Sequence, residues 1–317
     1  MDGSFPITNQ EILDYFNNNP TLTHTGLRIK TIIEIEKTTG IPLICYTSKT
    51  SNIQQGMRPS IEDDDIDGFS DLIHKIDGEN IDVFIISNGG YPNSAERIIN
   101  LLRNKYKKIR FIVTGNAYSA ATIMCFAADE IIMHRQGTLG PIDPQINGIP
   151  AYDILKGFEK LQEKIKNEGI NLLPLYLPLL ENYDLTLFEI CRKAQELSEE
   201  LAKQYLRVYM FKDLKNKAIK DEKIKRIVDY FMDHEQHKLH GRSIERKMAK
   251  LKELNIKDSE SIKNDNGNSE STNESLDNLI LSLHNQYRAL FTNSSCYKIF
   301  ENSKGISLAR IFQPNYK

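Results

Sequence analysis

The stretch from Ile109 to Met133, IRFIVTGNAYSAATIMCFAADEIIM, places two apolar runs on either side of a segment rich in small residues. The first run, 109–115, has the largely apolar pattern that is typical of a strand buried on both faces of a parallel sheet. The small residues open a helix-like apolar body, and 130–133 is again strand-like. Strand, helix and strand in this order predict a right-handed βαβ crossover.

The same pattern continues toward the N-terminus. Residues 81–87, IDVFIIS, form a second apolar run, and NGG ends it before a helix with apolar residues on one face. Farther upstream, Ser60 could cap a helix whose first turn carries acidic residues. The predicted fold class is therefore α/β, with a largely parallel sheet and peripheral helices. Helices are predicted over 27–39, 60–76 and 94–106, and a further strand over 41–48.

The C-terminal half has a mainly helical pattern. Residues 221–254 carry three histidines, and a strand-like segment, GISLARIFQ, follows the last predicted helix. The stretch DSESIKNDNGNSESTNESL is too polar to bury enough apolar surface to order itself, which predicts a disordered linker. The predicted organisation is an N-terminal extension (1–26), a main domain (27–257) with a helical arm (151–215), the linker (258–276) and a C-terminal helix and tail (277–317).

Composition limits the possible partners. The 317 residues include 41 basic and 43 acidic side chains, so no general attraction to nucleic acid is expected. Four scattered cysteines form no C-x-x-C pair, and with an N-terminus unlike a signal peptide they predict free thiols and a cytoplasmic location. The apolar segment 170–180 has about half of the ~20 residues that span a bilayer and contains two prolines, so we expect a buried loop or interface rather than a membrane span.

Two features follow neighbouring strands at their carboxyl ends, where parallel sheets bind ligands. Gly89 and Gly90 allow a sharp turn that exposes backbone N–H groups, and Ser119 lies at or just before a helix start. Separately, each has an ordinary structural explanation, a turn or a helix N-cap. Together they describe an acyl-transfer site in which Ser119 is the nucleophile and the N–H groups of Gly90 and Ala120 bind the oxyanion, each donor being worth roughly 3–4 kcal/mol in the transition state.

A serine nucleophile needs a proton acceptor within hydrogen-bond reach. The segment DHEQHKLHG contains three histidines, of which His240 precedes a glycine and a helix start. Loops carry catalytic groups more often than helix faces do, so His240 is the first candidate base and His237 the second, with Asp143 orienting the imidazole. The alternative is a solvated polar turn. On a helix His240 would point away from His234, so no metal site is expected.

Three segments carry a family resemblance: 82–98, 109–133 and GTLGPIDPQI at 137–146. They resemble the Clp-protease/crotonase-like serine peptidases, and most closely the serine dehydrogenase proteinase family, which is related to signal peptide peptidase A. The resemblance implies a spiral of ββα units, ATP-independent proteolysis and homo-oligomers, commonly rings. It covers residues 28–150 and, more loosely, 240–256 and 296–311.

Carried onto this sequence, the resemblance matches Ser119 to the nucleophile, and Gly90 and Ala120 to the oxyanion-hole donors. Asp143 lies close to the place where Clp peptidases carry a histidine. His240 matches a histidine that precedes an apolar residue and a helix in the closer family. The resemblance implies no cofactor.

The sequence also departs from the family pattern. Asn88 stands where the peptidases usually have a proline before the glycine pair, so a looser oxyanion hole is expected. The region 172–182 lacks the lysine base of the signal peptide peptidase type, although Lys156 and Lys160 lie nearby in sequence. His134, directly after a strand-like run, is a further candidate base that we expect at the surface.

Three functions are compatible with these residues. The first is a serine endopeptidase that needs no cofactor and cleaves peptide or unfolded protein through an acyl-enzyme. The second is a crotonase-like acyl-CoA enzyme, which would hold an enolate with the paired N–H groups but has no need of a serine at the helix start. The third is an assembly module on the same fold whose catalytic residues have decayed, as Asn88 and the lack of a defined base would allow.

Overall fold

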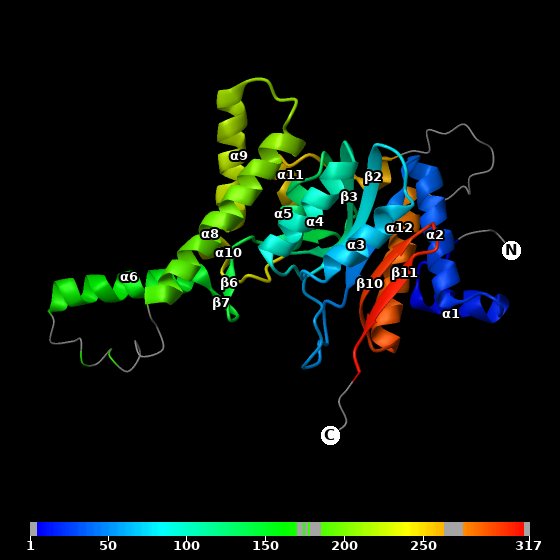
Figure 1. Ribbon diagram of the computed structural model, residues 1–317, viewed down its shortest axis with the longest axis horizontal. Helices are drawn as coiled ribbons and strands as arrows, with labels where there is room; N and C mark the ends of the chain where they lie inside the picture. Colours follow the sequence, from blue (N-terminus) through cyan, green and yellow to red (C-terminus); the bar gives the residue numbers. More distant parts are fainter. Residues whose placement is uncertain (1–4, 170–173, 175–176, 178–184, 263–274, 314–317) are drawn as a thin grey trace.

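A largely parallel sheet forms the centre of the protein, as the sequence predicts (Figure 1). The computed structural model describes residues 5–169, 174, 177, 185–262 and 275–313. Within these residues the main sheet has nine strands, and its continuous order is β11-β10-β1-β2-β3-β4-β9. Helices lie around the sheet, so the mixed α/β class with peripheral helices is confirmed.

Five strands run parallel through the middle of the sheet. Each neighbouring pair among them is joined by a parallel ladder, for example through Phe84 beside Ile112 and Phe111 beside Ile131. Every residue of the first of these strands is buried, which is why its sequence shows no apolar–polar alternation. The strands are β1 (Leu43–Ser48), β2 (Asn80–Ser87), β3 (Lys108–Ala117), β4 (Glu130–Met133) and β9 (Ile256–Asp258).

Helices cover both faces of this sheet, and alternate strand residues contact each layer. Val83 and Ile85 pack with α3 (Asp65–His74), α4 (Pro92–Lys105) and α5 (Ala120–Phe126) in one apolar cluster. Phe84 and Ile86 pack with α2 (His24–Thr39) and α12 (Leu276–Asn293) in the other. The period of two along each strand therefore divides the core into two layers.

An antiparallel edge lies on the far side of β1. Strand β10 (Cys296–Asn302) pairs with β1, and β11 (Ser307–Ile311) pairs with β10. The strand-like pattern near the C-terminus corresponds to β11, whereas β10 is a strand that the sequence analysis did not identify. Arg28 of α2 binds Glu301 of β10 at 2.8 Å, with both side chains buried.

Two predicted helices have different bounds in the structure. The helix predicted from Ser60 begins at Asp65, because Ser60 and Ile61 are not helical and Ile61 pairs with Gly90 instead. The helical region predicted over 221–254 is interrupted, with Lys238 in a left-handed conformation at φ 64°. It comprises α9 (Lys217–Met232), α10 (His234–His237), β8 (Ile244–Glu245) and α11 (Arg246–Leu251).

A helical arm leads away from the sheet (Figure 1). It contains α6 (Ala151–Glu168) and α8 (Leu185–Tyr205), which pack on each other around Ile154 and Cys191. A short π-helix, η2 (Leu206–Met210), continues α8 into the core, where Tyr205 and Leu206 are buried. The arm is therefore attached to the sheet domain through the C-terminal end of α8.

Some predictions fall on residues that the structure does not describe. The linker predicted at 258–276 lies mostly outside the described residues, although Ser259–Ser261 form a 3-10 helix, η3. Nearly all of the apolar segment 170–180 is outside them as well. No helix among the described residues is both long and apolar enough to cross a membrane. The N-terminal region contains α1 (Asn9–Asn18), whose cap residue Thr8 forms a capping box with Glu11.

Candidate active site

Ser119 has a strained backbone at the point where β3 leads into α5. Its φ is 54° and its ψ is −121°, and its side chain makes no helix-capping hydrogen bond. A residue with a Cβ atom in such a sparsely populated conformation costs about 1–3 kcal/mol, and strain of this kind clusters at functional sites. Ser119 therefore occupies the N-cap position of α5, as its place in the sequence suggests, but its hydroxyl does not cap the helix.

The glycine pair allows three backbone segments to approach closely. Gly89 has a φ of 94°, and a Cβ atom there would lie 2.5 Å from the carbonyl oxygen of Tyr118 and 2.7 Å from Cβ of Ser119. A Cβ atom on Gly90 would lie 2.8 Å from Cα of Ile61 and closer still to its N and O atoms. Both glycines are required because a larger residue would push the turn away from Ser119 or from Ile61.

The two expected oxyanion donors lie on adjoining segments. Ile61 donates to the carbonyl of Gly89 and accepts from the N–H of Tyr91, both at 2.9 Å. Neither the N–H of Gly90 nor that of Ala120 has a hydrogen-bond acceptor among the described residues. The amide nitrogen of Ala120 lies 3.0 Å from the position that a Cβ atom on Gly89 would take, so the start of α5 is against the turn.

Asn88 ties the glycine turn to its neighbours. Its side-chain amide donates to the carbonyl of Thr50 at 2.9 Å and accepts from the side chain of Asn116 at 3.0 Å. A proline at this position would restrict the turn through its ring. Here two hydrogen bonds restrain it from both sides instead, which is a physical reason against the looser hole that the sequence suggests.

His240, the first candidate base, contacts Asp143. Nδ1 of His240 lies 2.8 Å from Oδ1 of Asp143, and the aspartate side chain is only 2% exposed. When Nδ1 donates to the carboxylate, Nε2 is left as the acceptor of the neutral imidazole. His240 lines the same cavity as Gly90 and Ser119. The structure thus brings three of the candidate site residues, Gly90, Ser119 and His240, to one cavity, with Asp143 in contact with the imidazole.

A second histidine contacts the same aspartate. Nδ1 of His234 lies 3.0 Å from Oδ2 of Asp143, and its Nε2 lies 3.1 Å from Oδ2 of Asp153 on α6. Gln145 also donates to Asp143, at 3.2 Å. The sequence pattern assigns His234 no role at the site. The only signal in the sequence is the three-residue spacing of His234, His237 and His240, and this spacing does not show that two of them contact Asp143.

The other candidate bases lie elsewhere. His237 is buried, its Nε2 lies 2.7 Å from the carbonyl of Tyr230, and burial lowers its pKa. His134 is fully buried, so the expectation that it lies at the surface was wrong; its Nδ1 accepts from the N–H of Gln136 at 3.1 Å. No lysine of the described chain lines the cavity, and Lys156 is paired with Glu159 on α6.

The loop that carries Asp143 is fixed against the start of α5. Oγ1 of Thr122 accepts from the N–H of Gly140 at 3.0 Å, and it lies 2.6 Å from the carbonyl oxygen of Ala117 and 3.0 Å from that of Gly140. A Cβ atom on Gly140 would lie 2.8 Å from the ring of Tyr118. The loop also contributes the short strands β5 (Thr138–Leu139), β6 (Gln145–Ile146) and β7 (Ile149–Pro150). These contacts attach the loop to α5 and to the residue before Ser119.

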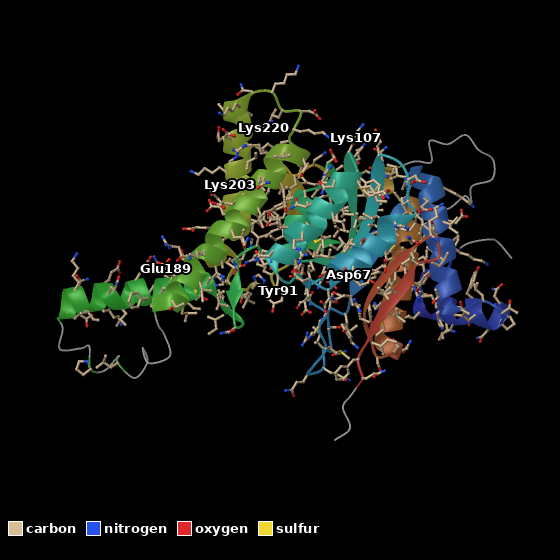
Figure 2. The ribbon with its side chains drawn as sticks, viewed as in Figure 1. Asp67, Tyr91, Lys107, Glu189, Lys203 and Lys220 are labelled. Atoms are coloured by element: carbon tan, nitrogen blue, oxygen red, sulfur yellow. The ribbon has the colours of Figure 1, made fainter. Side chains whose placement is uncertain are left out.

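The cavity beside Ser119 has a volume of about 440 Å³ and mostly apolar walls. Leu197 of α8 contributes to it, so the base of the helical arm forms part of the site. Figure 2 shows Tyr91, an exposed residue of the lining, between the arm and Asp67 of α3. The apolar residues that line the cavity include Ile53, Ile123, Ile142, Ile146 and Leu197.

Comparisons with known proteins give similar sequences of unassigned activity. Two uncharacterised proteins of Methanocaldococcus jannaschii are similar to this chain. One is 30% identical over 126 residues, which cover 39% of this chain and 43% of the relative. The other is 31% identical over 128 residues, which cover 38% of this chain and 45% of the relative. The chain therefore spans less than half of the length of these relatives.

A solved structure and a family model also match. A mutant of the 1510-N membrane-bound stomatin-specific protease matches with a TM-score of 0.35 and 15% identity, over 62% of this chain and 74% of that one. A likeness of this size says nothing about function. The model for ClpP-like SDH-type serine proteinases matches residues 61–260, which include every candidate site residue. The chain therefore belongs to the ClpP-like SDH-type serine proteinase family.

Proposed function

We propose that this protein is a serine endopeptidase that cleaves peptide bonds through an acyl-enzyme on Ser119. Its family consists of serine proteinases, which supports peptidase chemistry in general. One observation carries the specific assignment: Ser119, Gly90 and His240 line one cavity, and His240 is oriented by the buried carboxylate of Asp143. No cofactor is needed, because these groups supply nucleophile, base and oxyanion donors.

The proposed reaction has two halves. Oγ of Ser119 attacks the carbonyl carbon of the substrate while Nε2 of His240 accepts its proton. The N–H groups of Gly90 and Ala120 bind the oxygen as it becomes negative, and they need no reorganisation because the turn and the helix start are already fixed. The intermediate then expels the amine, which takes the proton from His240. Water, activated by the same imidazole, hydrolyses the acyl-enzyme.

The substrate that best fits the site is an extended peptide or unfolded protein with an apolar side chain for the cavity. Among the described residues that line the cavity there is no aspartate, glutamate, lysine or arginine. A charged group of the substrate would therefore find no oppositely charged side chain there. The same lack of cationic groups disfavours the acyl-CoA alternative, since CoA phosphates need them. ATP independence, a cytoplasmic location and homo-oligomers remain predictions.

Substituting the nucleophile tests the proposal. Ser119→Ala removes the attacking oxygen, so we expect casein and peptide cleavage to fall to background while the circular dichroism spectrum stays unchanged. Ser294→Ala is the matched control, because Ser294 caps the C-terminal end of α12 and binds the carbonyl of Leu290 instead of the cavity. Cleavage that survives in Ser119→Ala would exclude an acyl-enzyme on Ser119. Binding of CoA esters by both the wild type and Ser119→Ala, without peptide cleavage by either, would favour the crotonase-like reaction.

A further inference from the structure

Ile61 supports the glycine turn through its own backbone. Its N–H donates to the carbonyl of Gly89, and its carbonyl accepts from the N–H of Tyr91, both at 2.9 Å. It approaches Gly90 so closely that a Cβ atom there would lie 2.8 Å from Cα of Ile61. Any shift of Ile61 must therefore move Gly90, whose N–H is the proposed oxyanion donor.

A buried ion pair holds both neighbours of Ile61. Nζ of Lys298 donates to the carbonyl of Ser60 at 2.7 Å. Oδ2 of Asp65 accepts from the N–H of Glu62 at 3.1 Å. Lys298 and Asp65 bind each other at 2.7 Å, with side chains only 3% and 1% exposed. The ion pair is therefore hydrogen-bonded to the backbone of both neighbours of Ile61, namely Ser60 and Glu62.

The ion pair is itself anchored in the sheet. Lys298 belongs to β10 and lies opposite Ser48 of β1. The hydroxyl of Tyr46, two residues earlier on β1, donates to Oδ2 of Asp65 at 2.9 Å. Asp65 opens α3, so sheet, helix and the segment at Ile61 meet at one carboxylate.

Stability alone does not explain this arrangement. A buried ion pair loses hydration that its mutual attraction often does not recover, and apolar residues of similar volume are frequently as stable. What the pair adds here is fixed geometry, since three hydrogen-bond donors converge on Asp65 and Lys298 reaches the backbone of Ser60.

We propose that Lys298 and Asp65 are positioning residues that hold Ile61 against the turn and thereby set the Gly90 N–H for the oxyanion. This inference rests on the proposed function. It predicts that the pair acts on the rate of acylation of Ser119 and not on substrate binding, because neither side chain lines the cavity.

Arg28 and Glu301 supply a matched control on the same strand. They also form a buried ion pair at 2.8 Å that uses β10, with side chains 3% and 0% exposed. This pair joins β10 to α2 and contacts neither Ile61 nor its neighbours. Arg28→Met and Glu301→Gln should therefore cause a comparable loss of stability without disturbing the turn.

The experiment compares Lys298→Met with Arg28→Met, and the milder Asp65→Asn with Glu301→Gln, in the full-length chain. A fluorophosphonate probe gives the maximal inactivation rate and the probe's apparent binding constant, with the reactive fraction fixed by titration. We expect the maximal inactivation rate of Lys298→Met to fall roughly tenfold to a hundredfold. This decrease is no larger than the one caused by removing an oxyanion donor outright. The apparent binding constant of the probe should change little. Asp65→Asn should fall in the same direction, and the control variants should keep the wild-type rate per reactive site.

Amide hydrogen exchange gives a second readout that does not depend on catalysis. The N–H groups of Ile61 and Tyr91 should exchange faster in Lys298→Met and Asp65→Asn but not in the controls. Unchanged exchange, or an unchanged maximal rate in both test variants, overturns the positioning role. If the wild-type protein does not react with the probe at all, the proposed function fails, while exchange at Ile61 still decides whether the ion pair holds this segment.

Discussion

Nδ1 of His240 lies 2.8 Å from Oδ1 of Asp143, and this carboxylate is almost wholly buried. If Nδ1 carries the proton and donates it to this carboxylate, Nε2 is the ring nitrogen that can accept a proton, and His240 lines the same cavity as Ser119. Asp143 is thus placed to fix both the tautomer and the direction of the base.

Asp143→Asn should lower the rate far more than it lowers stability. The amide can donate to Nδ1 and so favour the wrong tautomer, a change that costs up to roughly 10⁴-fold in a serine peptidase triad. We expect kcat for a peptide substrate to fall by at least about a hundredfold, with KM nearly constant. Asp153→Asn serves as the comparison, because Asp153 contacts His234 and not His240. Equal losses in the two variants would contradict the assigned role.

Three histidine variants identify the base. His240→Gln should reduce acylation of Ser119 to background, because no other imidazole lines the described part of the cavity. His237→Gln removes the hydrogen bond to the carbonyl of Tyr230, so it should lower the free energy of unfolding by about 1–3 kcal/mol with a smaller effect on rate. His234→Gln should have an intermediate effect through Asp143. Single-turnover rates of Ser119 acylation in the folded variants identify the base. If His237→Gln abolishes acylation while His240→Gln stays active, the base is His237 and not His240.

Gly90→Ala tests the close approach of the turn to Ile61. The added Cβ would overlap the backbone of Ile61, which cannot rotate away, so we expect the turn to shift and activity to fall by roughly 10²-fold or more. Gly157→Ala is the control, since nothing lies within 4 Å of a Cβ at this position of α6. It should leave activity intact and stabilise the helix by about 0.5–1 kcal/mol. Thermal unfolding and peptide cleavage measured on both variants give the comparison.

The sequence predicted the parallel core because strands buried on both faces leave an unmistakable apolar pattern. Strand β10 was missed because three of its residues, Lys298, Glu301 and Asn302, are polar yet buried. Their partners include Asp65 and Arg28, which lie far away in the chain, so no local pattern reveals them. Long-range ion pairs and hydrogen bonds provide the partners that these buried polar side chains need.

Local rules likewise found only part of the candidate site. Glycine turns and a serine at a helix start are visible in sequence, and they predicted the positions of Gly90 and Ser119. The backbone strain at Ser119 and the pairing of Ile61 with Gly90 depend on packing between segments, so they were not foreseen. The sequence suggested that Asp143 orients His240, but it did not suggest the second contact of Asp143, with His234 91 residues later in the chain.

Acid should destabilise the protein partly through His284. This side chain is mostly buried, with Nδ1 3.0 Å from Oγ1 of Thr114, and burial lowers its pKa to about 4. The unfolded chain binds a proton near pH 6.5, before the folded chain does, so stability is lost as the pH falls from about 6.5 to about 4. His284 should contribute a loss of about 2 kcal/mol between pH 7 and pH 5.

Chemical denaturation at these two pH values checks that figure. His284→Gln should lose about 2 kcal/mol less than the wild type over the interval, whatever its stability at pH 7. The lowered pKa of His237 acts in both proteins and therefore cancels. His74→Gln, which alters an exposed histidine of α3, should behave like the wild type. An acid sensitivity that is the same in all three proteins would remove His284 from the explanation.

The most direct test of the central claim is to map the site of fluorophosphonate labelling by peptide mass spectrometry. If Ser119 is the activated nucleophile, the adduct mass should appear on the peptide that contains it, at one label per chain. The label should be absent from Ser119→Ala and from His240→Gln, and present in the Ser294→Ala control. An unlabelled wild-type protein, or an adduct on another residue that persists in Ser119→Ala, would contradict the account.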